Sequence, residues 1–201
     1  MAVNLVVDTK AINRVAIDLR EVPKEMPKAV MQAVNRTVDH VYTHTSREVR
    51  KEYAISDKDV KSTLKKVKAS SRNAKAGVIA TGRTLTLYNH FRVTPKQPKP
   101  GGRYKVKVAI KKGKSQELKT NPKPFIASAN RSTQVFKREG PERTPVVVLR
   151  SLSVPQMIAH KDSFTEAGKR IQALADKKLD ERIEHEVNRR MEKLHGSEAG
   201  K

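Results

Sequence analysis

A chain of 201 residues is long enough for one sizeable core, but with 36% hydrophobic and only 4% aromatic residues that core must be aliphatic and thin. The 43 lysines and arginines against 21 aspartates and glutamates leave a net charge of +22, which indicates an acidic partner such as nucleic acid or acidic protein. The lack of cysteine excludes disulfides, thiolate catalysis and cysteine-based zinc sites, and no apolar run reaches the roughly 18 residues that a membrane-spanning helix needs, so no membrane partner is expected.

Two helices are predicted in the first quarter of the chain. Asp8 and Thr9 are suited to cap a helix at about 12–19, which Pro23 ends. A long helix at about 25–53 follows, because apolar residues recur every three or four positions along one face. The residues of that face are Val30, Val34, Val38, Val41, Thr45, Val49 and Tyr53.

A shorter helix and the first strand are expected next. Ser56 stands at capping-box spacing from Asp59, so a helix should begin there, and its inward residues at helical spacing are Val60, Leu64 and Val67. From Gly77 the apolar period changes to two. Residues 84–88 alternate leucines with polar residues, which predicts a strand with one buried face.

A sheet is predicted for the rest of the central segment. The sequence TPKQPKPGG at 94–102 opposes both helix and strand and is expected to form a protruding Pro/Gly-rich loop. Residues 103–111 alternate apolar and basic side chains and give the clearest strand. Further apolar runs complete a mostly antiparallel sheet of about four or five strands, and they lie at 125–129, 135–136 and 146–149.

A long C-terminal helix closes the predicted fold. Ser163 and Glu166 have capping-box spacing at its start, and Gly196 is expected to end it. The fold class is therefore α+β, with the long N-terminal and C-terminal helices packed on the sheet. We expect a single domain over 1–195 and a flexible tail at 196–201. The domain divides into a helical part (1–72), a basic sheet part (73–150) and the C-terminal helix (151–195).

The positive charge is concentrated in the sheet part. Residues 73–150 hold 18 lysines and arginines but 3 glutamates, whereas residues 151–201 hold 10 basic and 9 acidic residues. This asymmetry predicts an acidic partner for the sheet, either nucleic acid bound by non-specific electrostatics or acidic protein. The candidate contacts are Arg103, Lys105, Lys107, Lys111, Lys112 and Lys114.

No catalytic or metal-binding motif emerges. His40 and His44 have the spacing of helical metal ligands, but no glutamate follows His40 and no third ligand is evident. Gly113, Lys114 and Ser115 match the end of a phosphate-binding loop, but Val108 stands where its first glycine should be. We therefore expect no enzymatic activity, no cofactor and no metal.

The order of elements and one motif carry a family resemblance. A short helix, a long helix and the segment AISDKDVKSTLKKVK at 54–68 precede the basic sheet, and a five-residue motif then leads into the terminal helix. The motif consists of Ser153, Val154, Pro155, Gln156 and Met157. Over about residues 10–190, the chain resembles the prophage minor tail protein Z family.

The resemblance implies a structural virion protein made in the bacterial host cytoplasm. It implies a place at the neck or head-proximal end of the tail, action in tail completion and head–tail joining, and a homo-oligomeric ring, for which a hexamer is one option. The neighbours would be tail terminator, tail tube or head-completion proteins, with phage DNA as a further contact. The alternative hypothesis is a free basic nucleic-acid-binding protein. The helix faces suited to subunit packing are those of Val34, Val38, Val41, Ile171, Leu174 and Ile183.

Overall fold

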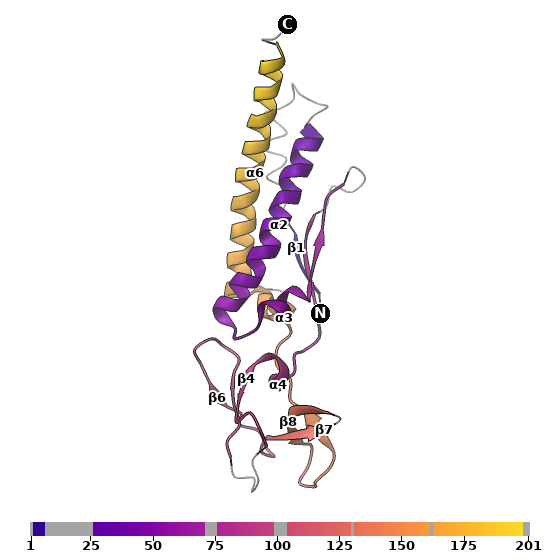
Figure 1. Ribbon diagram of the computed structural model, residues 1–201, viewed down its shortest axis with the longest axis vertical. Helices are drawn as coiled ribbons and strands as arrows, with labels where there is room; N and C mark the ends of the chain where they lie inside the picture. The colour runs from indigo at the N-terminus through magenta and orange to yellow at the C-terminus, as the bar shows by residue number, and fades with distance from the viewer. Residues whose placement is uncertain are drawn as a thin grey trace.

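The computed structural model describes residues 2–6, 26–70, 76–98, 104–129, 131–160 and 163–198. The molecule is elongated: two long helices lie side by side at one end, and small sheets gather at the other (Figure 1). The helix expected at 12–19 lies outside the described residues, as do residues 99–102 of the expected Pro/Gly-rich loop. Helices and antiparallel strands together confirm the α+β class.

The two long helices form an antiparallel pair. They are α2 (Met26–Glu52) and α6 (Glu166–Glu198). Ion pairs fix their direction, because Arg36 near the start of α2 meets Glu186 late in α6, whereas Glu48 near the end of α2 meets Arg170 early in α6. The long helices predicted from sequence periodicity are confirmed at both places.

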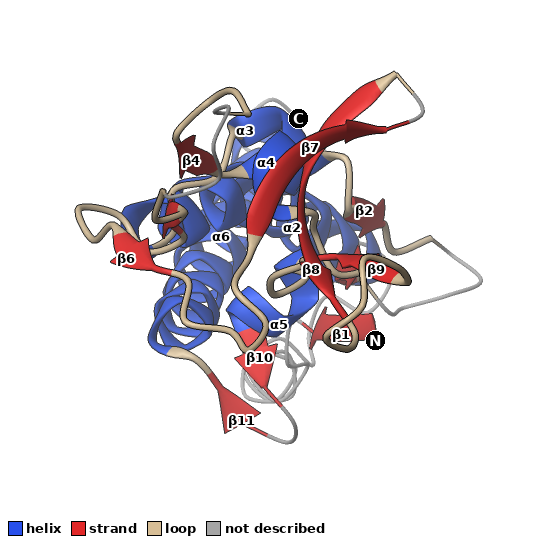
Figure 2. Ribbon diagram, turned by 90° about the horizontal axis from the view of Figure 1, so that it is seen from below, coloured by secondary structure: helices blue, strands red, loops and turns tan. Residues whose placement is uncertain are grey.

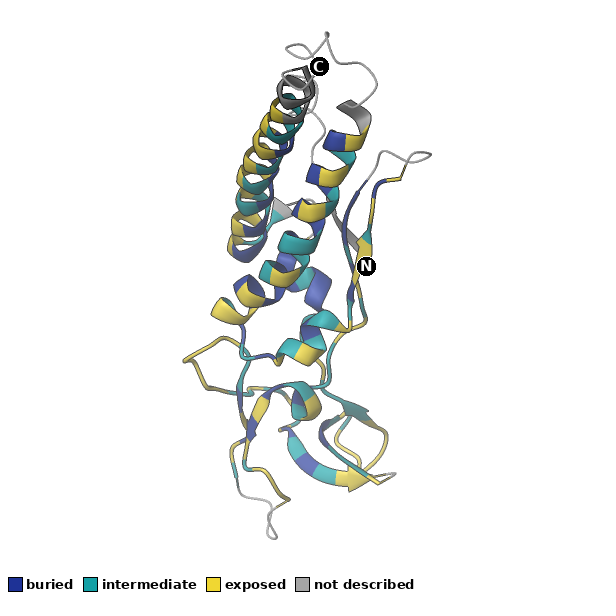
Figure 3. Cartoon of the chain, turned by 45° about the horizontal axis from the view of Figure 1, so that its top comes forward, coloured by how far each residue is buried: buried dark blue, intermediate teal, exposed yellow. Residues whose placement is uncertain are grey.

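Aliphatic side chains at helical spacing hold this pair together. Val38 and Val41 of α2 are at most 1% exposed, and the buried residues of α6 follow a four-residue spacing that includes Ile171 and Leu179. Figure 3 shows buried and exposed residues alternating along both helices. Two buried threonines also lie on α2; Thr37 and Thr45 donate their hydroxyls to backbone carbonyls four residues earlier, at 2.9 and 2.7 Å, so neither buried hydroxyl lacks a partner.

A three-stranded antiparallel sheet packs beside α2. Its order is β1 (Ala2–Val6), β3 (Gly77–Thr81) and β2 (Leu64–Val67). The expected helix near Ser56 begins correctly, since the Ser56 side chain caps α3 (Asp57–Lys61) by accepting a hydrogen bond from the backbone of Asp59. The helix ends sooner than predicted, because Leu64–Val67 pairs with β3 and tertiary strand pairing overrides the helical spacing of its apolar residues.

The opposite end of the molecule holds two further small sheets. One has the order β4 (Arg92–Thr94), β5 (Lys107–Ala109), β6 (Gln116–Glu117), and the other β7 (Phe125–Ala129), β8 (Ser132–Arg138), β9 (Val146–Val148). Figure 2 shows them spread around the end of the helices. All pairings among the described strands are antiparallel, as expected, but separate three-stranded sheets replace the single sheet of four or five strands.

The strand predicted at 84–88 is wrong. Thr86 makes only an isolated bridge with Arg150, and α4 (Leu87–His90) begins directly after it. The alternation of leucine and polar residues arises because Leu87 is buried while Leu85 packs partly buried against the core. One continuous apolar cluster, from Val34 in α2 to Val135 in β8, joins the two ends of the molecule.

A tight connection leads into α6. Helix α5 (Val154–Ile158) is followed by the short strands β10 (Ala159–His160) and β11 (Ser163–Phe164). Ser163 was predicted to cap this helix, but it is paired in strand β11. Thr165 caps α6 instead, because its hydroxyl accepts a hydrogen bond from the backbone N–H of Gly168 at 3.2 Å. The helix also continues through Gly196 to Glu198, because one glycine costs a helix only about 1 kcal/mol.

Candidate partner-binding surface

The basic strand predicted at 103–111 keeps its alternation of buried and exposed residues over the described residues 105–108, but only Lys107–Ala109 pairs as a strand. Val106 and Val108 are 1% and 2% exposed, while Lys105 and Lys107 between and beside them are exposed. The pleat of β5 therefore turns the apolar residues to the core and the lysines to solvent. Of the six nominated contacts, Arg103 lies outside the described residues and the other five are exposed on β5 or beside it.

The lysines after β5 lie on a turn attached to the end of α2. The backbone N–H of Lys112 donates to the carbonyl of Glu52 at 2.7 Å, and that of Ala54 donates to Ile110 at 2.8 Å. Within the turn, Lys114 N–H donates to Lys111 at 3.2 Å, and Gly113 has a φ of 75°, which glycine adopts at little cost. The backbone that carries these lysines is therefore fixed by hydrogen bonds.

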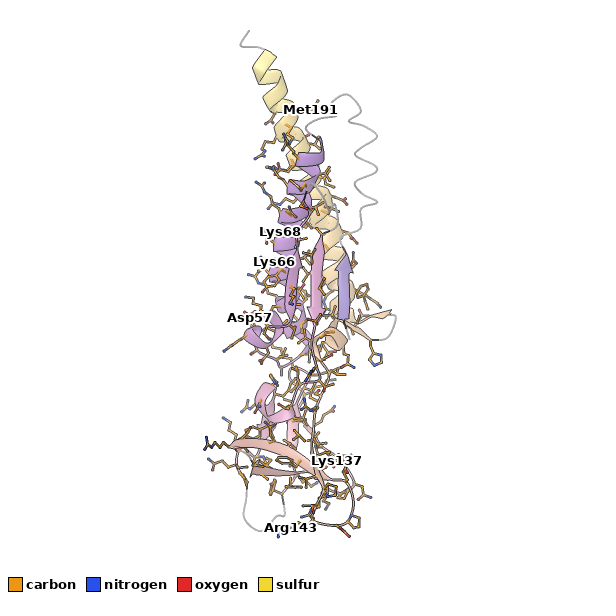
Figure 4. The ribbon with its side chains drawn as sticks, turned by 90° about the vertical axis from the view of Figure 1, so that its right-hand side faces the viewer. Asp57, Lys66, Lys68, Lys137, Arg143 and Met191 are labelled. Carbon is orange, nitrogen blue, oxygen red and sulfur yellow. The ribbon has the colours of Figure 1, made fainter. Side chains whose placement is uncertain are left out.

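Cations at this end of the molecule have few carboxylate partners. Within the described stretches 84–98, 104–129 and 131–150, the one lysine or arginine paired with a carboxylate is Lys105, whose Nζ lies 3.1 Å from Glu117. Figure 4 shows Lys137 and Arg143 at this end, far from Lys66 and Lys68 beside α2. We call the exposed basic residues of these stretches the basic surface; it comprises Arg92, Lys96, Lys105, Lys107, Lys111, Lys112, Lys114, Lys119, Lys123, Arg131, Arg138, Arg143 and Arg150.

Many charges in the helical part are paired within the chain. Arg170 bridges Glu48 and Glu52 at 3.0 and 3.2 Å, and Glu186, which is fully buried, contacts Arg36 and Arg189 at 2.5 and 3.0 Å. Hydrogen bonds from Lys66 and Lys68 lower the pKa of Asp39 below its ordinary value. The helices thus neutralise much of their own charge, and the basic surface does not.

Arg92 was missed by the sequence analysis. It lies on β4 directly across from Ala109 of β5, so it joins the solvent face that carries Lys107. Its segment, Arg92–Thr94, has the burial order exposed, buried, exposed. That alternation is too short to predict a strand by itself, and only the pairing with β5 places Arg92 beside the nominated lysines.

The helix faces nominated for subunit packing are mostly covered by the chain itself. Val34, Val38 and Val41 are at most 3% exposed, and Ile171 and Ile183 at most 2%, whereas Leu174 is half-buried. The five buried side chains belong to one apolar cluster that spans α2 and α6. Within the described residues, the nominated set therefore leaves Leu174 as the residue with surface free for a second subunit.

The five-residue motif forms a capped helix start. The Ser153 hydroxyl accepts from the backbone of Gln156, and the Gln156 side chain accepts from the backbone N–H of Ser153 at 2.9 Å. Val154 and Met157 are fully buried. The motif thus begins α5, which packs against α6 and the β1–β3–β2 sheet, and it serves the fold where the sheets connect to the terminal helix.

His40 and His44 stack on each other. Their ring centroids lie 4.2 Å apart, and the described residues contain no group of three or more histidines or carboxylates that could hold a metal ion. The described helices also include none that is long and apolar enough to cross a membrane. Burial, and then the neighbouring His44, Lys178 and Arg182, lower the pKa of His40.

We expect His40 to make stability fall in acid. Because the pKa of His40 is lower in the folded chain, the unfolded chain binds more protons below the ordinary value of about 6.5, so the free energy of unfolding falls as pH drops through that value. Urea denaturation between pH 7.5 and 5 should show a smaller fall in His40→Gln than in the wild type. His185→Asn, at an exposed position on α6, is the control, and an unchanged pH profile in His40→Gln would contradict the expectation.

Comparison with known proteins identifies the family. A family model described as prophage minor tail protein Z (GPZ) matches residues 9–195. Neither the curated proteins nor the solved structures give a significant match. The matched range includes α2, all but the last three residues of α6, every described strand from β2 onward and the capped motif at Ser153, so the resemblance drawn from element order and motif is confirmed. The chain belongs to the prophage minor tail protein Z family.

Proposed function

We propose that this chain, a structural component of a phage tail, completes the tail at its head-proximal end and helps to join head and tail as a subunit of a ring. Its role in this proposal is architectural and not enzymatic. The basic surface faces an acidic neighbour in the neck, and the α2–α6 pair gives each subunit a rigid body. The neighbours are tail terminator, tail tube or head-completion proteins, or the DNA that passes them.

One observation carries the proposal: exposed, uncompensated cations gather at one end of an elongated molecule whose helices pair their own charges. Unpaired surface cations repel each other unless something acidic lies nearby. Lys107, Lys111, Lys112 and Lys114 have no carboxylate partner among the described residues, although glutamate and aspartate are plentiful on α6. This segregation supports a permanent acidic partner at the sheet end of the subunit.

The proposal can be tested by complementing a phage that lacks this gene. We expect the quadruple variant Lys107→Gln, Lys111→Gln, Lys112→Gln, Lys114→Gln to lower the yield of infectious particles by at least about tenfold, since each lost charge pair at an interface weakens binding. Electron microscopy should then show heads and tails that have not joined.

A matched control removes the same charge elsewhere. Arg47, Lys58, Lys65 and Lys177 are exposed, lie outside the basic surface and have no carboxylate partner among the described residues. Changing these four to glutamine should leave the yield within about threefold of the wild type. Equal losses in both variants, or virions that lack the wild-type protein, would contradict the proposal.

A further inference from the structure

A hollow lies where the basic surface meets the end of α2. Its volume is about 490 Å³, and it is lined by Ala54, Arg92, Thr94, Ala109 and the turn residues Gly113, Lys114 and Ser115. Arg92 and Thr94 are two apart on β4 and so share one face, and Ala109 stands directly across from Arg92 on β5. Val93 between them is buried on the opposite face.

The polar groups of the hollow are hydrogen-bond donors without partners. Arg92 and Lys114 are exposed cations, and Thr94 and Ser115 add two hydroxyls. Within the described part of the chain, no carboxylate lines the hollow and none of these four side chains has a hydrogen-bond or ion-pair partner. The site therefore offers charge-assisted donors to an anionic group.

Three of the residues that line the hollow are small. Ala54 and Ala109 have only a methyl group, and Gly113 has no side chain. These small residues leave room for the methylene groups of a ligand, whose charge Arg92 and Lys114 can meet. Duplex DNA is rigid and presents its phosphates to cations that project from a surface. The alanines that line the hollow would therefore add nothing to the binding of DNA.

The hollow is formed before any partner arrives. The bridge between Tyr53 and Lys111 and the two backbone hydrogen bonds beside it hold the turn against α2. A fixed backbone loses little conformational entropy when a ligand binds. The geometry of the donors is thus set by the fold.

We propose that this hollow binds an acidic side chain, aspartate or glutamate, that a protein neighbour inserts into it. The inference deepens the proposed function, on which it rests, by naming the site and the chemistry of the partner. The carboxylate lies between Arg92 and Lys114 and accepts from Thr94 or Ser115, and the methylene groups contact Ala54 and Ala109. The remaining cations of the basic surface attract the partner without forming a pocket for it.

Nuclear magnetic resonance of the full chain can test this site. The probe is a capped pentapeptide, Ala-Glu-Glu-Glu-Ala, compared with its glutamine counterpart, inorganic phosphate and a 12-base-pair DNA duplex. We expect the acidic peptide to shift the backbone amides of Ala54, Ala109 and Gly113–Ser115 saturably. The double variant Arg92→Gln, Lys114→Gln should weaken this binding at least tenfold.

The matched control is Lys119→Gln with Lys123→Gln, which removes two exposed, unpaired cations of the basic surface outside the hollow. It should weaken peptide binding less than twofold. Three results would each overturn the inference: equal weakening by both double variants, equal shifts with the glutamine peptide, or shifts of the same amides by phosphate or duplex DNA at lower concentration than by the acidic peptide.

Failure of the site and failure of the function give different results. If the acidic peptide binds in the hollow but phage lacking the protein assemble normally, the inferred site stands and the proposed function fails. If phage need the protein but Arg92→Gln, Lys114→Gln binds the peptide as the wild type does, the proposed function stands and the inference fails.

Discussion

Replacing Gly168 with alanine is expected to lower the free energy of unfolding by about 3 kcal/mol, near the upper end for overpacked cores. A β-carbon at this position would lie 2.1 Å from the carbonyl oxygen of Ile158 and 2.9 Å from the ring of Phe164. The oxygen belongs to the backbone at the end of α5, so a side-chain rotation cannot relieve the clash. Urea denaturation followed by circular dichroism measures the change.

Gly140 provides the control for this experiment. A β-carbon there would meet nothing within 4 Å, and the residue lies in an exposed connection between β8 and β9. Gly140→Ala should therefore leave stability unchanged or raise it slightly, because alanine restricts the unfolded chain. Equal destabilisation by the two substitutions would show that α5 and α6 are not packed as closely as Gly168 requires.

Replacing Ile171 with alanine should cost about 3 to 4 kcal/mol of folding stability. Ile171 is fully buried in the apolar core on α6, which packs against α2, so the substitution leaves a cavity in that core. Chemical denaturation at two protein concentrations measures this loss. The same loss at both concentrations would mean that the chain itself, and not a second subunit, buries the side chain.

Leu174 lies one turn further along α6 and is only half-buried. Leu174→Ala should cost less than about 1.5 kcal/mol, since less apolar area is removed from contact. If Ile171→Ala changed the oligomeric mass but not the stability, the assignment of this helix face to the interior of the subunit would be wrong.

Periodic apolar patterns allowed the long elements to be predicted. Helix α2 follows from an apolar spacing of three to four that persists over many residues. The spacing of two at 103–111 predicted which lysines are exposed, but only Lys107–Ala109 of that stretch forms strand β5. Short elements were misassigned, because Leu64–Val67 has helical spacing but takes its structure from pairing with β3. The capping residue of α6 was also misplaced, since Ser163 and Thr165 are both suitable caps and only the β10–β11 pairing selects Thr165.

The candidate surface was only partly predictable. The exposure of Lys105 and Lys107 follows from alternation along one strand. The hollow could not be predicted from this alternation. It requires Arg92 on β4 to lie across from Ala109 on β5, and it requires the turn after β5 to bind the end of α2. Such contacts between distant segments leave no periodic signal in a single sequence.

The separation of charge along the molecule gives it an electric dipole. Helix α6 alone, with 33 residues, is about 50 Å long, several times the ~10 Å over which salt screens a charge at 0.1 M ionic strength. An acidic assembly therefore attracts the near, basic end of the subunit while the far end of the α2–α6 pair feels almost no field. We therefore expect the subunit to turn its basic end towards such an assembly before contact.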